Sequence, residues 1–172
     1  MATLQEEIAL CPHMVKRLAN ATCESHAYVT SDFTYRTRCA AGEGWVMVGD
    51  AFGFLDPIYS SGVMLALKSG ELAADAVHEA LAANDLSTVR LGSWVPRLTE
   101  GMQHIRKLVY AFYNREFSFG GFLRKFPQYH DDVVRVLIGD VFDGGIDGIF
   151  NALGTWIDLP EPIKLEHPAE IV

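Results

Sequence analysis

Residues 45–62, WVMVGDAFGFLDPIYSSG, form the most informative stretch of this 172-residue chain. They begin with four consecutive apolar residues, a pattern typical of a strand that is buried on both faces. The apolar run ends at Gly49 and Asp50, and a loop that contains glycine, proline and two serines follows. About twenty residues of helical character come next, from residue 63 to residue 82, so the stretch predicts a strand, a loop and a long helix.

This predicted arrangement has the parts of a ligand site. Gly49 allows a close approach of the backbone, and the Asp50 carboxylate can accept hydrogen bonds from sugar or polyol hydroxyl groups. The first amides of the helix, those of Ser61, Gly62 and Val63, point along the helix dipole toward negative charge. The pattern therefore favours a polyhydroxylated, anionic ligand.

Residues 49–76, GDAFGFLDPIYSSGVMLALKSGELAADA, resemble the second flavin-binding motif of a group of FAD-dependent oxidoreductases. This group includes the flavin-dependent halogenases, the geranylgeranyl reductases and the aromatic-hydroxylase-type monooxygenases. The likeness joins Gly-Asp, Asp-Pro and Ser-Ser-Gly at fixed spacing. Residues 32–38, DFTYRTR, and 44–49, GWVMVG, also resemble the strands that precede the motif in the halogenase-like branch.

The resemblance implies FAD as the cofactor and assigns a role to each part of the motif. Asp50 would bind the ribityl chain, and Gly49 would make room for it. Asp56 and Pro57 would turn the chain beneath the region between the pyrophosphate and the flavin ring.

The end of the motif would face the flavin ring itself. By resemblance, the amides of Ser61, Gly62 and Val63 would lie at the pyrimidine edge of the isoalloxazine and stabilise negative charge on the reduced flavin. In halogenases the same turn lies beside a halide site, so Ser61 and Gly62 are also the candidate halide ligands.

Other features of the family do not occur in these residues. There is no GxGxxG turn for the adenine end of FAD, no WxWxIP segment, and no early lysine of the halogenase type. We therefore expect the C-terminal portion of a larger flavoenzyme, with a start at Met1 that is not the start of the intact protein. We expect this chain alone to retain no stoichiometric FAD, and to expose apolar surface that the missing N-terminal FAD-binding half or an oligomer partner would cover.

The expected fold class is mainly α with a few β-strands (α+β), the C-terminal part of an FAD/NAD(P)-binding α/β flavoprotein fold without its dinucleotide-binding half. We expect one unit over residues 1–172. The apolar spacing predicts two short helices over residues 3–20, separated at Cys11-Pro12, and one or two half-buried strands over residues 26–40. The expected parts are strands and the flavin-binding loop in residues 1–62, a helical region in 63–157 that includes helices near 93–114, 131–139 and 145–157, and a tail in 158–172.

Aromatic residues are dense between residues 112 and 129. They favour either core packing or a wall of an apolar substrate pocket, and the two interpretations stay open. The candidate pocket residues are Tyr110, Tyr113, Phe119 and Phe122.

Composition excludes several classes of protein. The chain has 14 Lys+Arg against 22 Asp+Glu, a net charge of −8, which argues against a nucleic-acid binder. Three cysteines without metal-ligand spacing predict a reducing compartment, and we expect a cytoplasmic protein without a membrane span. No metal site is expected, because the histidines form no HxxxH pair and Asp140, Asp143 and Asp147 lack the spacing of a calcium loop.

The leading hypothesis is an FAD-dependent oxidoreductase or monooxygenase that acts on a small organic substrate through reduced flavin, by halogenation, hydroxylation or reduction of a double bond. No catalytic side chain is assigned. The alternative is a non-catalytic helical interaction module derived from such an enzyme. A hydrolase that uses Ser60 or Ser61 is disfavoured, because Ile58 and Tyr59 stand where a GxSxG elbow requires glycine, and helix capping is the preferred role for these serines.

Overall fold

The computed structural model describes residues 2–31 and 33–162. Its contacts form two compact units, Met1–Asp32 and Phe33–Val172. The first unit contains α1 (Ala2–Leu10) and α2 (Pro12–Arg17), and neither helix has a buried residue. Proline lacks the amide that would continue a preceding helix, so α2 begins at Pro12, as the sequence predicted.

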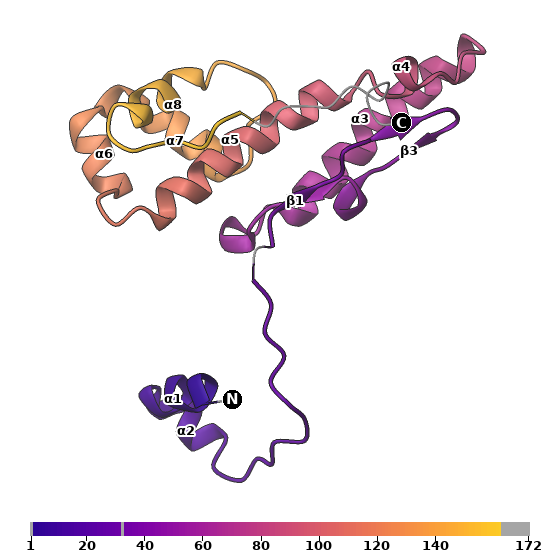
Figure 1. Ribbon diagram of the computed structural model, residues 1–172. Coiled ribbons are helices and arrows are strands. Elements are labelled where there is room, and N and C mark those ends of the chain that lie inside the picture. The colour runs from indigo at the N-terminus through magenta and orange to yellow at the C-terminus, as the bar shows by residue number, and fades with distance from the viewer. Residues whose placement is uncertain (1, 32, 163–172) are drawn as a thin grey trace. The chain divides into compact units, whose positions relative to one another are not determined.

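Over its described residues, 33–162, the second unit is mainly helical and has four very short strands, as expected for its fold class (Figure 1). The strands are β1 (Tyr35–Arg36), β2 (Ala41–Gly42), β3 (Trp45–Val46) and β4 (Gly53–Phe54). The α-helices are α3 (Gly62–Ala82), α4 (Thr88–Leu91), α5 (Val95–Tyr113), α6 (Phe119–Lys125), α7 (His130–Leu137) and α8 (Asp147–Gly154). Single 3-10 turns occur at η1 (Gly49–Ala51), η2 (Pro57–Tyr59) and η3 (Pro127–Tyr129).

The strands form two antiparallel pairs, β1 with β4 and β2 with β3. The prediction of a strand buried on both faces is therefore wrong, since Trp45 and Val48 are 42% and 38% exposed. Within the described residues β3 has one neighbouring strand, so Trp45 stays exposed while Val46 packs against the core. Gly44 has φ +76° in the two-residue turn between β2 and β3, a conformation that glycine adopts without steric cost.

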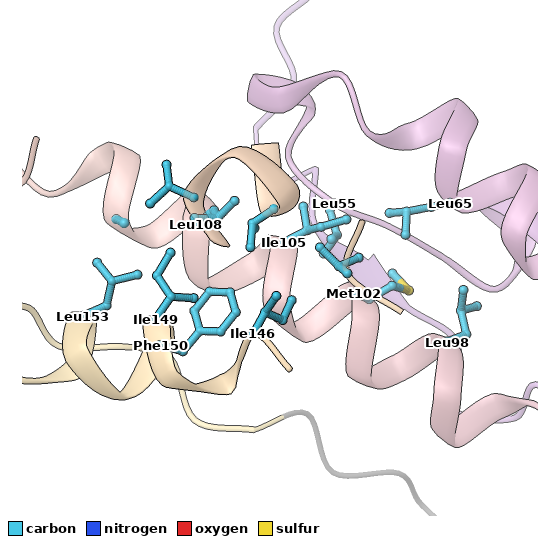
Figure 2. Packing of buried hydrophobic residues seen from close by; sticks show 14 of the residues in the cluster. Leu55, Leu65, Leu98, Met102, Ile105, Leu108, Ile146, Ile149, Phe150 and Leu153 are labelled. Carbon is cyan, nitrogen blue, oxygen red and sulfur yellow. The ribbon is translucent and has the colours of Figure 1, made fainter. Parts of the chain in front are cut away.

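The two long helices agree with their predicted ranges. Helix α3 covers residues 62–82, and α5 has Pro96 in its first turn, where a missing amide costs no helical hydrogen bond. Figure 2 shows the buried row of α5 lying between side chains of the loop and α3 on one side and those of residues 146–153 on the other. The row consists of Leu98, Met102, Ile105 and Leu108.

Aromatic packing closes the C-terminal end of the unit, where α6, α7 and α8 gather around the end of α5 (Figure 1). Phe122 is fully buried there, with its ring centroid 5.1 Å from that of Phe126 and 6.4 Å from that of Trp156. Helix α6 was not predicted. Ser118 is the sequence feature that could have indicated this helix, because serine favours the N-cap position. Its hydroxyl accepts a hydrogen bond from the Gly121 amide at 3.1 Å and caps the helix.

No helix in the described part of the chain combines the length and the apolar character that a membrane crossing needs.

Candidate functional site

The loop of residues 48–63 is held against α3 at its first glycine. Gly49 has φ +58°, and a Cβ at this position would lie 3.5 Å from the Ala66 Cβ. The Gly49 amide donates a hydrogen bond to Ser69 Oγ at 2.8 Å, and the Ser69 hydroxyl donates to the Ala66 carbonyl at 2.7 Å. The close approach that Gly49 permits in this structure is therefore one between the loop and the helix.

We expect Ser69→Ala to lower the free energy of unfolding by about 1–3 kcal/mol, because the Gly49 amide would lose its acceptor at a position where Ser69 is only 1% exposed. Urea unfolding followed by circular dichroism measures the change. Ser93→Ala is the matched control, because Ser93 is exposed and should change the free energy by less than about 0.5 kcal/mol. Equal effects of the two substitutions would contradict the anchoring role of Ser69.

Asp50 lies in η1 with an exposed side chain. Its backbone carbonyl accepts a hydrogen bond from the Tyr35 hydroxyl at 2.9 Å. None of the hydrogen bonds or ion pairs among residues 2–31 and 33–162 uses the Asp50 carboxylate. The carboxylate is therefore free to accept hydrogen bonds from a ligand, while Tyr35 fixes the backbone that carries it.

Asp56 shapes the next turn. Its Oδ1 accepts a hydrogen bond from the Ile58 amide at 3.1 Å, which caps η2 at Pro57. Its own amide donates to Thr34 Oγ1 at 3.0 Å, and its carboxylate accepts a hydrogen bond from the Tyr113 hydroxyl at 3.2 Å. The expected Asp-Pro turn is present, and its carboxylate already has two partners within the protein.

The two serines lead into α3 by a strained backbone. Ser60 has φ +54°, a left-handed conformation that costs about 1–2 kcal/mol for a residue other than glycine. Ser61 takes the N-cap position, but its backbone is helical and its hydroxyl makes no capping hydrogen bond. The prediction of a capping side chain is therefore wrong for Ser61, because the N-cap geometry that aims the hydroxyl at the first turn requires an extended backbone.

The first turn of α3 presents unused donors. Among the described residues, no hydrogen bond uses the amides of Gly62, Val63 or Met64, whereas the Leu65 amide donates to the Ser61 carbonyl at 2.9 Å. Val63 is 74% exposed. The start of a 21-residue helix therefore offers free N–H groups at an accessible surface.

Two hollows border this helix start. An open groove of about 790 Å³ lies between α3 and the segment after α7, and its lining includes Ser60, Val63, Met64, Leu67, Ile138 and Asp140. A smaller cavity of about 100 Å³ is lined by residues that include Tyr59, Ser61, Met64, Ile105 and Leu108. Asp50 and the free amides belong to one strand–loop–helix segment, and α5 and the end of α7 complete the walls of the hollows beside it.

The candidate substrate-pocket residues differ widely in burial. Tyr110 and Tyr113 are 48% and 60% exposed on α5, Phe119 is half-buried, and Phe122 lies in the core. Neither hollow described above has any of the four in its lining.

Three contributors to the site were missed in the sequence, namely Tyr35, Ser69 and Tyr59. Tyr59 donates from its hydroxyl to the Leu108 carbonyl at 3.4 Å, and burial raises its pKa to about 12. The residue types of Tyr35 and Ser69 carried no signal, because only the folded chain brings them beside Asp50 and Gly49.

Metal-ligand types do not converge in the part of the chain that the structure describes, where no group of three or more His, Cys, Asp or Glu side chains could hold a metal ion. Asp140 instead accepts a hydrogen bond from Arg135 Nε at 2.6 Å, and Asp143 pairs with Arg97 at 3.3 Å.

Comparison with known proteins assigns this segment to a family. Residues 13–118 match the tryptophan halogenase family. The chain is 35% identical over 136 residues to a 1H-pyrrole-2-carbonyl-[peptidyl-carrier protein] brominase of Pseudoalteromonas luteoviolacea, an alignment that covers 78% of this chain and 32% of the brominase. It is 32% identical over 114 residues to the corresponding chlorinase of Pseudomonas fluorescens, over 66% of this chain and 25% of the chlorinase.

A solved structure gives the same result. The flavin-dependent brominase Bmp2 matches with a TM-score of 0.63 and 31% sequence identity, over 84% of this chain and 37% of that chain. The chain belongs to the flavin-dependent halogenases of the tryptophan halogenase family. It spans between a quarter and a third of the length of the two curated relatives.

Proposed function

We propose that this chain supplies the flavin-facing loop and C-terminal helices of an FAD-dependent halogenase that acts on an aromatic group. The observation that carries the proposal is that one segment, which matches the halogenase family, contains both the exposed Asp50 carboxylate and the start of α3. Neither the carboxylate nor the first amides of α3 have a hydrogen-bond partner among the described residues. When bound, reduced flavin supplies the oxidative chemistry, and the protein supplies orientation and electrostatics.

The residues of the loop fit a flavin nucleotide in their donor and acceptor types. Asp50 would accept hydrogen bonds from ribityl hydroxyl groups, which need acceptors at an exposed position. The amides of Ser61, Gly62 and Val63 would donate to the pyrimidine edge and favour negative charge there. Asp56 and Pro57 would act indirectly, because they set the turn that leads to these amides.

The same helix start supports a halide site at Ser61 and Gly62. Ser61 is only 8% exposed, lines the smaller cavity, and makes no side-chain hydrogen bond with the described residues. A hydroxyl donor on a largely buried residue, beside free amides at a helix N-terminus, suits a small anion.

For the substrate, we propose an aromatic acyl group carried on a carrier protein, because the brominase and the chlorinase named above act on 1H-pyrrole-2-carbonyl groups on a peptidyl-carrier protein. Tyr110 and Phe119 are the candidates for its wall. Tyr113 contacts Asp56, and Phe122 would support the wall from the core. Hydroxylation and the geranylgeranyl-reductase type of reduction are the competing reactions of the same cofactor.

The test is a chimera of the Pseudoalteromonas brominase in which the 136 matching residues are replaced by those of this chain. We expect it to retain FAD through gel filtration and to give a halogenated product from the pyrrolyl carrier protein in the presence of bromide, NADPH and a flavin reductase. Replacing Asp50 with Ala in the chimera should weaken FAD binding about tenfold or more, since a charged hydrogen-bond acceptor is lost.

Mass spectrometry separates the reactions, because bromine, oxygen and hydrogen add different masses to the product. A folded chimera that binds no FAD would refute the proposed cofactor site. A chimera that binds FAD and gives only hydroxylated or reduced product would replace halogenation by one of the competing reactions.

A further inference from the structure

We infer that Tyr113 is a positioning residue that holds the Asp56 turn, and through it the start of α3, in the geometry that the proposed flavin site needs. The Tyr113 hydroxyl lies 3.2 Å from Asp56 Oδ2 and 3.4 Å from Asp56 Oδ1. This contact joins residues 57 positions apart in the sequence, so it ties the C-terminal end of α5 to the loop. The inference rests on the proposed function of that loop.

Asp56 is the residue through which this contact can act. Its Oδ1 also accepts the Ile58 amide, so the carboxylate that Tyr113 holds is the one that caps η2. The turn ends at Ser60, whose amide donates to the Pro57 carbonyl at 2.8 Å and whose backbone is left-handed. Ser61 and the free amides of α3 follow at once, so a shift of the Asp56 carboxylate would be passed directly to them.

A second tyrosine joins the same two segments, but here the hydroxyl group belongs to the loop and its acceptor belongs to α5. Tyr59 of η2 donates to the Leu108 carbonyl of α5, and its ring meets that of Phe112 edge to face, with centroids 6.0 Å apart. Phe112 in turn meets the Tyr113 ring edge to face at 5.4 Å. Tyr59, Phe112 and Tyr113 therefore form a continuous series of ring contacts between η2 and the last turns of α5, which we call the aromatic clamp. Tyr113 is the member of the clamp that contacts the capping carboxylate of Asp56.

The protonation state of Tyr113 suits this role. Partial desolvation raises the pKa of its hydroxyl, and the charge and hydrogen bond of Asp56 raise it further. The hydrogen bond is then fully present below the ordinary tyrosine pKa of about 10 and is lost as the pH rises through the raised value. Tyr113 thus donates to Asp56 across the physiological range.

The test compares Tyr113→Phe with Tyr110→Phe in the full chain, by residue-resolved amide hydrogen exchange at pH 7. Tyr110 lies on the same helix, and its ring contacts Arg106 at 5.4 Å without a hydrogen bond to the loop. We expect Tyr113→Phe to speed exchange of the Ile58 and Ser60 amides on the order of fivefold, the effect of one lost hydrogen bond, and Tyr110→Phe to leave it unchanged. Equal exchange in the two variants would overturn the inference.

A second readout distinguishes positioning from a general loss of stability. In the chain labelled with 13C at tyrosine Cζ, the Tyr113 resonance is assigned from its loss in Tyr113→Phe, and its titration is followed by NMR. Asp56→Asn removes the charge and keeps a side chain that can cap η2, so the pKa of Tyr113 should fall toward its ordinary value. An unchanged titration would show that Tyr113 does not act on Asp56, which also overturns the inference.

The exchange and titration results do not depend on the proposed function. If the chimera described above fails to bind FAD, the flavin site fails, while exchange and titration still report on the clamp. If Tyr113→Phe loosens the loop but leaves the FAD affinity of a flavin-loaded chimera unchanged, the clamp has no positioning role and the inference is wrong.

Discussion

Phe122→Ala is expected to lower the free energy of unfolding by about 3–5 kcal/mol, the cost of removing a large ring from a packed core. Phe122 has no exposed surface. Its ring has neighbours on several sides, with centroid distances of 5.1 Å to Phe126, 6.2 Å to Phe117 and 6.3 Å to Tyr129. These neighbours come from the segment before α6, the residue after it and η3, so the cavity cannot close by the movement of one side chain.

Phe119→Ala is the comparison, because Phe119 belongs to the same helix and is only half-buried. We expect it to cost clearly less than Phe122→Ala. Urea or thermal unfolding of the full chain measures both changes. Similar losses of unfolding free energy in Phe119→Ala and Phe122→Ala would show that burial of the ring does not determine the cost of removing it. In the chimera, a change in substrate affinity caused by Phe119→Ala without loss of stability would instead support the interpretation of this region as a substrate wall.

The helices could be predicted from the sequence because their signals are local. Apolar positions recur at helical spacing along α3 and α5, and Pro96 marks the first turn of α5. Ser118 also marks a helix start, but α6 could not be predicted because Gly120 and Gly121 follow, and glycine has a low intrinsic preference for helix.

The strands could not be predicted as well, because their burial depends on distant partners. Four apolar residues at 45–48 are compatible with burial on both faces, yet the structure pairs β3 only with β2 on the described part of the chain. The sequence pattern indicates what a strand can tolerate, and it carries no information about which elements cover it.

In the candidate site, too, the residues marked by a local sequence pattern could be predicted, and those defined by contacts between distant segments could not. Gly49, Asp50 and the start of α3 were found because one contiguous motif contains them. Ser69 was missed because it meets Gly49 only when α3 folds back on the loop. Tyr113 was placed among candidate pocket residues, and the contact with Asp56 appears only once the end of α5 reaches the loop.

Gly62→Ala should separate ligand binding from folding. A Cβ at Gly62 would meet only the Phe54 ring, at an ordinary distance of 3.6 Å, and the backbone there does not have a positive φ. Alanine is favoured over glycine in helices by up to about 1 kcal/mol, so the free energy of unfolding should stay constant or rise. If the first turn of α3 approaches the flavin or the halide closely, the added methyl group should raise the Kd for FAD or the bromide requirement of the chimera about tenfold or more.

Gly70→Ala is the matched control, because it makes the same substitution in the interior of the same helix, where a Cβ would meet no atom within 4 Å. We expect it to raise the free energy of unfolding by about 0.5–1 kcal/mol and to leave FAD and bromide binding unchanged. Binding is measured by quenching of flavin fluorescence and by the bromide dependence of product formation. If Gly62→Ala binds FAD and bromide as Gly70→Ala does, the start of α3 does not lie against either ligand, because a close approach there could not accommodate the methyl group.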